Sequence, residues 1–357
     1  MNKPVLIPRE GLEVCWKSPS NIALIKYWGK TGRQLPQNPS LSITLDKAYT
    51  QTRVRVEPAG TGSGKAALHF TFNGSARPEF AQRLETFIAG IEDEITFLPQ
   101  ANLTIESSNT FPHSAGIASS ASAMSALALC LCDIQNQLTG NTLSHAELLR
   151  KASCLARLAS GSACRSVYGN FTVWGHHGQI EGSDNHFAIP LPVKIHPTFE
   201  NIKDAILIVD PETKKVSSSA GHRLMQGHPY AEARFAQANE NLGRLAVAIE
   251  QGNWDAFIAI TENEALSLHA MMMTSSPGYL LMKPETLTII DKIQAFRKQT
   301  GAKVCFTLDA GPNVHLLYAN HEQNNVLPLI ETLKDFCFNK SLLLDETGRG
   351  PLKLICN

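Results

Sequence analysis

The sequence predicts two α+β domains, and three observations support that fold class. The chain has 357 residues, and domains average about 150 residues, so two domains are expected. Helix-like and strand-like segments are intermixed in both halves, which favours mixed layers over an all-α or all-β fold. Pro190, Pro192 and Pro197 cluster between the halves. We therefore expect an N-terminal domain over residues 1–192 and a C-terminal domain over residues 193–357.

In the first half, polar and apolar residues alternate at residues 51–56 and again at 67–72, which predicts two strands. The Gly-rich stretch between them predicts a turn, so we expect a β-hairpin. Residues 119–138 are rich in Ala and Leu, include one Met, and lack Gly and Pro, which predicts a buried helix. A second helix is expected over residues 144–159, followed by a strand at 171–174.

The second half combines long helical segments with short apolar strands. Its expected elements, in chain order, are a strand at 205–209, helices at 230–251, 254–269 and 284–298, and strands at 304–308 and 314–318, with a turn at 309–313 between the last two.

Composition narrows the class of protein. Lys and Arg total 32 and Asp and Glu total 32, so the formal net charge is zero, which argues against nucleic acid or an anionic membrane as the main partner. The N-terminus lacks the apolar run of a signal peptide, and the most apolar stretch, residues 121–132, is too short to span a bilayer. Eight cysteines without a CxxC pair indicate reduced thiols. We expect a cytoplasmic protein.

The run GTGSGK at residues 60–65 superficially resembles a nucleotide P-loop. That motif, GxxxxGK[ST], requires Gly and a hydroxyl residue where this chain has Ala59 and Ala66. The hydroxyl that binds Mg²⁺ would be missing, and the surrounding pattern is that of a hairpin. A turn is the better interpretation.

The Gly- and Ser-rich run at residues 112–122 is a better candidate for phosphate binding. Small residues let the backbone approach a polyphosphate, and the following helix would present free N–H groups and its positive dipole end. Ser119, Ser120 and Ser122 would add hydroxyl donors. A Ser-capped helix without a ligand explains the same residues, so both interpretations remain open from this run alone.

The segment SPSNIALIKYWGK is the second candidate. A run suited to a buried strand, residues 22–25, ends in Lys26 and Lys30 beside Tyr27 and Trp28. Docking two cations against a core is costly unless they meet an anion. The alternative is two solvated lysines whose stems pack and whose charged heads reach water.

Two further segments carry chemistry. In ASGSACRS, at residues 159–166, Gly and Ser surround Arg165, an arrangement suited to fork-like recognition of phosphate or carboxylate. Asp309 opens a DAGPN turn after an apolar strand and could accept a proton from a hydroxyl or hold a metal. An exposed Arg in a loop and an Asp that caps a turn are the alternatives.

Taken together, these segments resemble those of the diphosphomevalonate decarboxylases, within the galactokinase–homoserine kinase–mevalonate kinase–phosphomevalonate kinase (GHMP kinase) superfamily. KYWGK and GSACRS resemble the decarboxylase branch, whereas the phosphate loop is shared with the kinases. The resemblance covers nearly the whole chain in the family's order. It implies an N-terminal ribosomal-protein-domain-2-like α/β sandwich, a C-terminal ferredoxin-like α+β domain, and an active site in the cleft between them.

The resemblance also implies a reaction. ATP, with Mg²⁺, would phosphorylate the 3-hydroxyl of mevalonate 5-diphosphate, and loss of phosphate and CO₂ would give isopentenyl diphosphate and ADP, in the mevalonate route of isoprenoid biosynthesis. Phosphate is a good leaving group, and its departure draws electrons from the carbon beside the carboxylate. The family resemblance further implies a homodimer.

Site residues follow from matching positions. Asp309 matches the family's catalytic Asp, which orients or deprotonates the 3-hydroxyl, and Lys26 and Arg165 complete the implied catalytic set. A Lys–Asp pair should keep the carboxylate ionised at neutral pH. The implied substrate-binding residues are Tyr27, Lys30, Ser160, Ser162, Arg165, and Ser218 with its neighbour Ser217. The implied ATP-binding residues are Pro112, Gly116, Ser119, Ser120 and Ser122, of which Ser119 and Ser120 would also hold Mg²⁺.

Three departures from the family pattern leave alternatives open. Thr31 follows Lys30 where relatives have Arg, Pro39 removes a hydroxyl and a backbone donor, and Ala220 follows the serine run where several relatives carry Arg. A mevalonate 5-phosphate decarboxylase giving isopentenyl phosphate is the first alternative. A small-molecule kinase without decarboxylation and a non-catalytic binding protein are the others.

Overall fold

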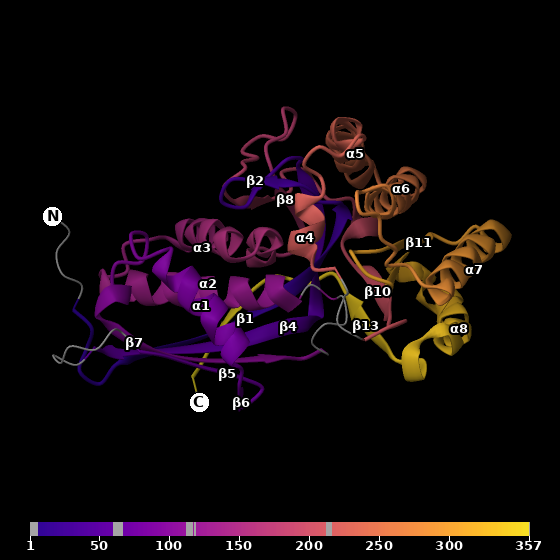
Figure 1. Cartoon of the computed structure of the whole chain (residues 1–357). Helices are drawn as coiled ribbons and strands as arrows, with labels where there is room; N and C mark the ends of the chain where they lie inside the picture. The colour runs from indigo at the N-terminus through magenta and orange to yellow at the C-terminus, as the bar shows by residue number, and fades with distance from the viewer. Residues whose placement is uncertain (1–5, 60–66, 112–116, 118, 212–215, 357) are drawn as a thin grey trace.

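The computed structural model describes residues 6–59, 67–111, 117, 119–211 and 216–356. Within these residues the chain forms two large sheets, each with helices packed against it (Figure 1). The elements of each half are intermixed helices and strands, so the predicted α+β class is confirmed.

The first sheet is built around two long strands, β1 and β4, which pair antiparallel over most of their length. Its strand order is β14-β1-β4-β7-β5-β6, and β8 joins β4 to β9. The strands are β1 (Leu12–Ile25), β4 (Ser40–Pro58), β5 (Leu68–Phe72), β6 (Ser75–Ala76), β7 (Ala101–Asn109), β8 (Phe171–Trp174), β9 (Ala188–Pro190) and β14 (Leu352–Leu354).

Helices α1 (Pro78–Ala89), α2 (Ser119–Leu138) and α3 (His145–Ala159) lie on one side of this sheet (Figure 1). Alternate apolar side chains of the strands, such as Val14 and Val54, pack against them because successive residues of a strand point to opposite faces. The bounds of α2 confirm the predicted helix. The second predicted helix, residues 144–159, is confirmed as α3. Ser144 caps this helix instead of being its first residue.

The predicted β-hairpin is wrong. Both strands exist, but β5 does not pair with β4; β7 lies between them, antiparallel to β4 and parallel to β5. Ile105 of β7, for example, pairs with Val54 on one side and with Phe70 on the other. Alternating polarity indicates which residues form a strand, but tertiary packing determines which other strand pairs with it. Residues 60–65, where a turn was preferred to a P-loop, lie outside the described residues.

The second sheet has the order β11-β12-β10-β13, all antiparallel. Its strands are β10 (Ile202–Leu207), β11 (Val304–Thr307), β12 (Val314–Ala319) and β13 (Leu342–Glu346), and its helices are α5 (Ala231–Gln251), α6 (Trp254–Met273), α7 (Pro284–Thr300) and α8 (Gln323–Leu333). The predicted helices are confirmed, with α6 running to Met273 rather than ending at His269. Strand β10 begins and ends earlier than expected.

Each face of the second sheet has its own core. Ala205 and Leu207 pack with residues of α7 and α8, while Ile202 and Ile206 pack with α5, α6 and the ends of β1 and β4. The short helix α4 (Ser218–Arg223) and the two-stranded ribbon of β2 (Lys30–Thr31) and β3 (Leu35–Pro36) lie near this junction (Figure 1). The ends of β1 and β11 therefore meet in the interior, which positions the site described below.

The two sheets are also joined through the C-terminal segment. Asp345 of β13 accepts the backbone N–H groups of residues 46, 47 and 48 in β4, at 2.9, 2.8 and 2.7 Å. Beyond it, β14 pairs with β1 in the first sheet. The division at residues 192 and 193 stays a prediction. Within the described part of the chain, no helix combines the length and apolar character needed to cross a bilayer.

Candidate active site

Lys26 and Asp309 meet where β1 and β11 end. Lys26 directly follows β1, and Asp309 begins the turn after β11. The Lys26 Nζ lies 3.1 Å from Asp309 Oδ1. The lysine is 2% exposed, whereas the side chain of Asp309 is 28% exposed. The carboxylate thus has a buried ammonium partner and remains partly exposed itself.

Burial shapes the protonation of this pair. Removal from water lowers the pKa of Lys26, and the neighbouring Asp309 carboxylate opposes part of that shift. The Lys26 ammonium also donates to the carbonyl of Ala23, which satisfies a second of its three donors. A cation at this distance favours the ionised carboxylate, so the arrangement suits a proton acceptor.

Arg165 is held rigidly beside the pair. It lies in a 3₁₀ segment, Gly161–Val167, and is 3% exposed. Its Nε and one terminal nitrogen donate to Asn21 Oδ1 at 3.4 and 3.3 Å, and the other terminal nitrogen donates to Ser40 Oγ. Electrostatic interactions couple the guanidinium to Asp309 and to Lys26. Three charged groups from distant parts of the chain are therefore brought together.

Tyr27 is packed into an aromatic cluster. Its ring lies 4.6 Å from the Trp174 ring and 4.3 Å from the His222 ring, centroid to centroid. A Cβ atom at Gly161 would lie 2.9 Å from the Tyr27 hydroxyl and 2.9 Å from the Trp174 ring, so a larger residue there would displace these rings. The hydroxyl is buried and has no hydrogen-bond partner among the described residues. Burial raises the pKa of Tyr27, so the phenol stays protonated and can donate.

His222 links α4 to the KYWGK segment. Its Nδ1 accepts the backbone N–H of Gly29 at 2.9 Å, and its ring also lies 4.6 Å from the Trp28 ring. Burial lowers the pKa of His222 to about 3, and the Lys30 cation adds to the effect. The imidazole is therefore neutral at physiological pH, and α4 is fixed against the lysine-rich segment.

A second cation, Arg223, interacts electrostatically with Lys30 next to this contact. Lys30 of β2 donates from Nζ to Gln34 Oε1 at 2.8 Å. Burial lowers the pKa of Lys30, and the positive charge of Arg223 in α4 lowers it further. Arg223 directly follows His222 and is exposed. Like charges held close favour an anion between or beside them.

The serines of the predicted phosphate loop fall into two groups. Ser119 and Ser120 are the first residues of α2, where helical N–H groups are free to bind an anion. Ser120 Oγ lies 3.5 Å from Ser160 Oγ, which brings the ATP-binding and substrate-binding candidates together. Ser122 is fully buried and its hydroxyl contacts Thr50 Oγ1 at 2.6 Å. Its predicted role in ATP binding stays a prediction.

The remaining predicted residues are placed as follows. Pro112 and Gly116 lie outside the described residues. Ser162 lies in the same 3₁₀ segment as Arg165, and its carbonyl accepts from Asn21 Nδ2 at 3.4 Å. Ser218 is the exposed first residue of α4, and Ser217 caps that helix by accepting the N–H of Ala220.

Candidate Mg²⁺ ligands are oxygen atoms. In the described part of the chain, three or more His, Cys, Asp or Glu side chains do not gather into a metal site. Mg²⁺ is commonly held by substrate phosphates and a few protein oxygens, and the hydroxyls of Ser119 and Ser120 at the start of α2 are oxygens of that kind. Cys164, next to Arg165, is buried, and burial raises the pKa of its thiol to about 12. It is therefore not an activated nucleophile.

Sequence reasoning missed several residues that organise the site. Asn21 and Ser40 accept hydrogen bonds from Arg165. Glu264 contacts the backbone of Lys26, and His269 contacts the backbone of Asp309. His222 links α4 to Gly29. Asn21 lies inside the SPSNIALIKYWGK segment and could have been found there. Glu264 and His269 lie in the middle of an ordinary helical pattern, which gives no local signal.

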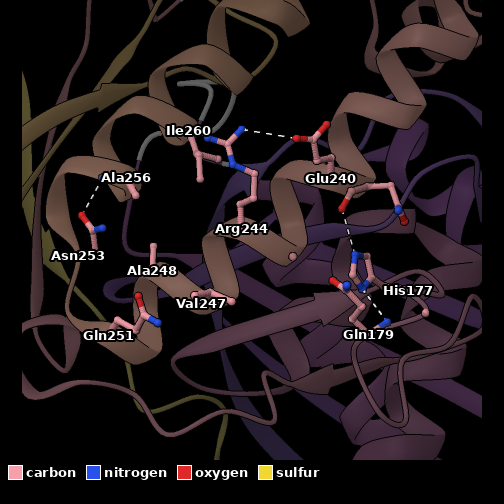
Figure 2. A pocket seen from close by; sticks show the side chains of 13 residues that line it. His177, Gln179, Glu240, Arg244, Val247, Ala248, Gln251, Asn253, Ala256 and Ile260 are labelled. Carbon is pink, nitrogen blue, oxygen red and sulfur yellow. Dashed lines mark hydrogen bonds and ion pairs between the residues drawn. The ribbon is translucent and has the colours of Figure 1, made fainter.

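A separate surface groove of about 730 Å³ lies along α5 and the start of α6 (Figure 2). His177 and Gln179 lie at one end and Asn253 and Ala256 toward the other. The predicted site residues that the structure describes do not line this groove. The volume of a groove alone therefore does not identify the cluster of Lys26, Arg165 and Asp309.

Comparisons with known proteins identify the family of the chain. Residues 18–186 match the family model "Diphosphomevalonate decarboxylase-like N-terminal domain", and residues 205–348 match "Mevalonate 5-diphosphate decarboxylase C-terminal domain". The diphosphomevalonate decarboxylase of Ganoderma lucidum is 31% identical over 331 residues, which cover 88% of this chain and 80% of the relative.

Solved structures give the same result. Mevalonate diphosphate decarboxylase from Staphylococcus aureus superposes with a TM-score of 0.82 at 27% identity, covering 96% of this chain and 98% of that chain. A structure described as MDDEF in complex with MVAPP, AMPPCP and magnesium has a TM-score of 0.80 at 27% identity, covering 96% and 99% of the two chains. The fold, the charged cluster and these similarities together show that the chain belongs to the diphosphomevalonate decarboxylase family.

Proposed function

We propose that the protein catalyses the ATP-dependent decarboxylation of mevalonate 5-diphosphate to isopentenyl diphosphate, ADP, phosphate and CO₂. The observation that carries this proposal is the Lys26–Asp309 pair, with Nζ and Oδ1 3.1 Å apart and the carboxylate partly exposed. The solved relative that binds MVAPP, AMPPCP and magnesium supports the substrate, ATP and Mg²⁺.

Asp309 is the group that accepts the proton of the tertiary 3-hydroxyl, or orients that hydroxyl toward the γ-phosphate. Phosphoryl transfer depends mainly on positioning and on neutralising charge. Lys26 meets both needs: it fixes the carboxylate and brings positive charge to the reacting centre. Arg165 adds a second cation, held by Asn21 and Ser40 so that it does not collapse onto Asp309.

The phosphorylated end of the substrate is bound by cations and hydroxyls from three segments. Lys30 and the Arg165 fork supply charge, and the protonated Tyr27 hydroxyl, buried without a partner among the described residues, supplies a donor. Charge-assisted hydrogen bonds of this kind are the strong ones. The complete proposed set is Tyr27, Lys30, Ser160, Ser162, Arg165 and Ser218.

The nucleotide phosphates are bound at the start of α2. Ser119 and Ser120 offer backbone N–H groups and hydroxyls there, and the helix dipole favours negative charge. Ser120 lies beside Ser160, so the γ-phosphate end of ATP would face the substrate. Mg²⁺ would supply charge neutralisation of the polyphosphate, with the hydroxyls of Ser119 and Ser120 as candidate ligands.

We also propose that the protein works as a cytoplasmic homodimer, as the family resemblance implies. Size-exclusion chromatography with light scattering tests the oligomeric state. A mass of one chain across the micromolar range would contradict the dimer.

The function is tested by supplying Mg-ATP with mevalonate, its 5-phosphate or its 5-diphosphate in separate reactions and measuring ADP and CO₂. Equal amounts of ADP and CO₂ with the diphosphate alone are expected. The same products only with the monophosphate would transfer the function to that substrate. ADP without CO₂ would show a kinase, and neither product would show a binding protein.

A further inference from the structure

Helix α6 contacts the backbone of both members of the Lys26–Asp309 pair. Glu264 Oε2 accepts the backbone N–H of Lys26 at 2.9 Å. Further along the same helix, His269 Nε2 donates to the backbone carbonyl of Asp309 at 3.1 Å. The two α6 side chains are 0% and 1% exposed, so bulk water does not compete for these bonds. One helix thus holds two residues that are 283 positions apart.

The acceptor on Glu264 is itself fixed. Both terminal nitrogens of Arg234 donate to its carboxylate, and Asn241 Nδ2 donates at 2.8 Å. A buried carboxylate needs such compensation, because an unpaired charge in the interior is strongly destabilising. These hydrogen bonds from α5 restrict the Glu264 side chain to one position. The carboxylate on α6 therefore holds the Lys26 N–H group in a fixed place.

The strand that leads to Asp309 is tied to the same helix. Glu262 Oε1 accepts the backbone N–H of Phe306 in β11 at 3.3 Å, and Arg297 of α7 pairs with that carboxylate. The fold of β11 therefore does not depend on His269. The His269 contact instead falls on Asp309 itself, beyond the end of β11.

We propose that Glu264 and His269 are positioning residues that set the geometry of the Lys26–Asp309 pair, Glu264 through the amide of Lys26 and His269 through the carbonyl of Asp309. This inference rests on the proposed function, in which the pair meets the substrate hydroxyl. A displacement of about 1 Å at such a site can cost about 100-fold in rate. Nucleotide binding at the start of α2 involves neither residue.

A double-mutant cycle tests the role of His269. His269→Leu is expected to lower kcat about 10- to 100-fold while the Kd for Mg-ADP stays unchanged. In the Asp309→Asn background the same substitution should add less than about twofold, because residues that act as a unit are not additive. His269→Gln, whose amide can donate to the carbonyl, should restore most of the lost kcat.

His228 offers a matched control. It is also buried, and its Nε2 bonds to the carbonyl of Met271 in the same helix at 3.1 Å. His228→Leu therefore removes an equivalent bond to α6 and should leave kcat within about twofold of the wild type. For Glu264 the variant is Glu264→Asp, which keeps the charge that Arg234 needs but withdraws the acceptor from Lys26. A lower kcat with an unchanged Kd for Mg-ADP is expected.

The outcomes separate the two proposals. Equal fold-losses from His269→Leu in both backgrounds, or equal losses from His269→Leu and His228→Leu, would overturn the positioning role. Wild-type kcat in Glu264→Asp would remove Glu264 from it. Wild-type turnover in Asp309→Asn alone would instead overturn the proposed function while leaving the contacts of α6 in place.

Discussion

The Lys26 ammonium lies 3.1 Å from the Asp309 carboxylate although 283 positions separate the two residues along the chain. The contact forms because β1 and β11, in different sheets, both end at the junction that α6 covers. The lysine is almost fully buried, and the aspartate is partly exposed. An acid held in this way is fixed in position yet accessible to a substrate, and the predictions below follow from that geometry.

Arg165→Ala is expected to weaken substrate binding more than turnover. The guanidinium meets charge that is present both before and after the chemical step, so its removal should raise KM roughly 10- to 100-fold, with a smaller effect on kcat. Steady-state kinetics measure both values. Arg244→Ala, at an exposed position on α5, is the control. A large fall in kcat at saturating substrate with unchanged KM would contradict the assignment.

Activity should fall at alkaline pH when Lys26 loses its proton. Burial lowers the pKa of Lys26 below its ordinary 10.5, with Asp309 and Glu264 opposing the shift and Arg165 adding to it. A cation that acts when protonated is active below its pKa and inactive above it. The alkaline limb of log kcat/KM, which reports the free enzyme, should therefore begin below pH 10.5.

Lys26→Arg provides the comparison, because a guanidinium keeps its charge to higher pH. Its maximal rate should be lower, since the fork does not fit the site of an ammonium, but its alkaline limb should move to higher pH. An unchanged limb in this variant would show that another group titrates.

Acid should destabilise the protein through His222. The pKa of this buried imidazole is about 3 in the folded chain against 6.5 for an ordinary histidine. Between these values the unfolded chain binds the proton and the folded chain does not, so stability falls as pH falls through 6.5. At pH 5 the loss from this group is about 2 kcal/mol relative to neutral pH.

Urea unfolding of the wild type and of His222→Gln at pH 7.5 and pH 5 measures this effect. The glutamine oxygen can accept the Gly29 N–H without titrating, so the variant should lose about 2 kcal/mol less than the wild type between the two pH values. Equal losses in the two proteins would contradict the account.

Asp345→Asn should loosen the junction between the sheets. The carboxylate accepts three backbone N–H groups of β4, and an amide would turn an NH₂ group toward one of them. Hydrogen bonds to a charged group contribute about 1.5 to 3 kcal/mol, so the free energy of unfolding should fall by about 2 to 3 kcal/mol. Asp335→Asn, at an exposed position, should leave the denaturation midpoint unchanged, and an equal loss in the two variants would refute the role of Asp345.

The sequence pattern predicted which residues form helices and strands more reliably than it predicted which strands pair with each other. The helix at 119–138 was predicted correctly because an Ala- and Leu-rich run without Gly or Pro has few alternatives. The strands β4 and β5 were also found, but their pairing was predicted wrongly because β7 comes between them. Polarity along a strand records which face is buried, not which strand lies beside it.

The residues of the candidate site were also predicted only in part. Lys26, Arg165 and Asp309 were singled out by unusual charges within apolar or glycine-rich segments, and the family resemblance supplied their grouping. Glu264 and His269 were missed because their partners are backbone atoms 238 and 40 positions away. Backbone amides and carbonyls occur all along the chain, so the sequence does not indicate which of them a side chain will contact. Such contacts appear only in the folded structure.

The turnover of Asp309→Asn with Mg-ATP and mevalonate 5-diphosphate tests the central claim most directly. The substitution keeps the shape of the side chain and removes its basicity, so release of ADP and CO₂ should fall by about 10²- to 10⁴-fold, while the Kd for Mg-ADP remains that of the wild type. Turnover within about twofold of the wild type would contradict the assignment of Asp309 as the carboxylate that accepts the proton of the reacting hydroxyl or orients that hydroxyl.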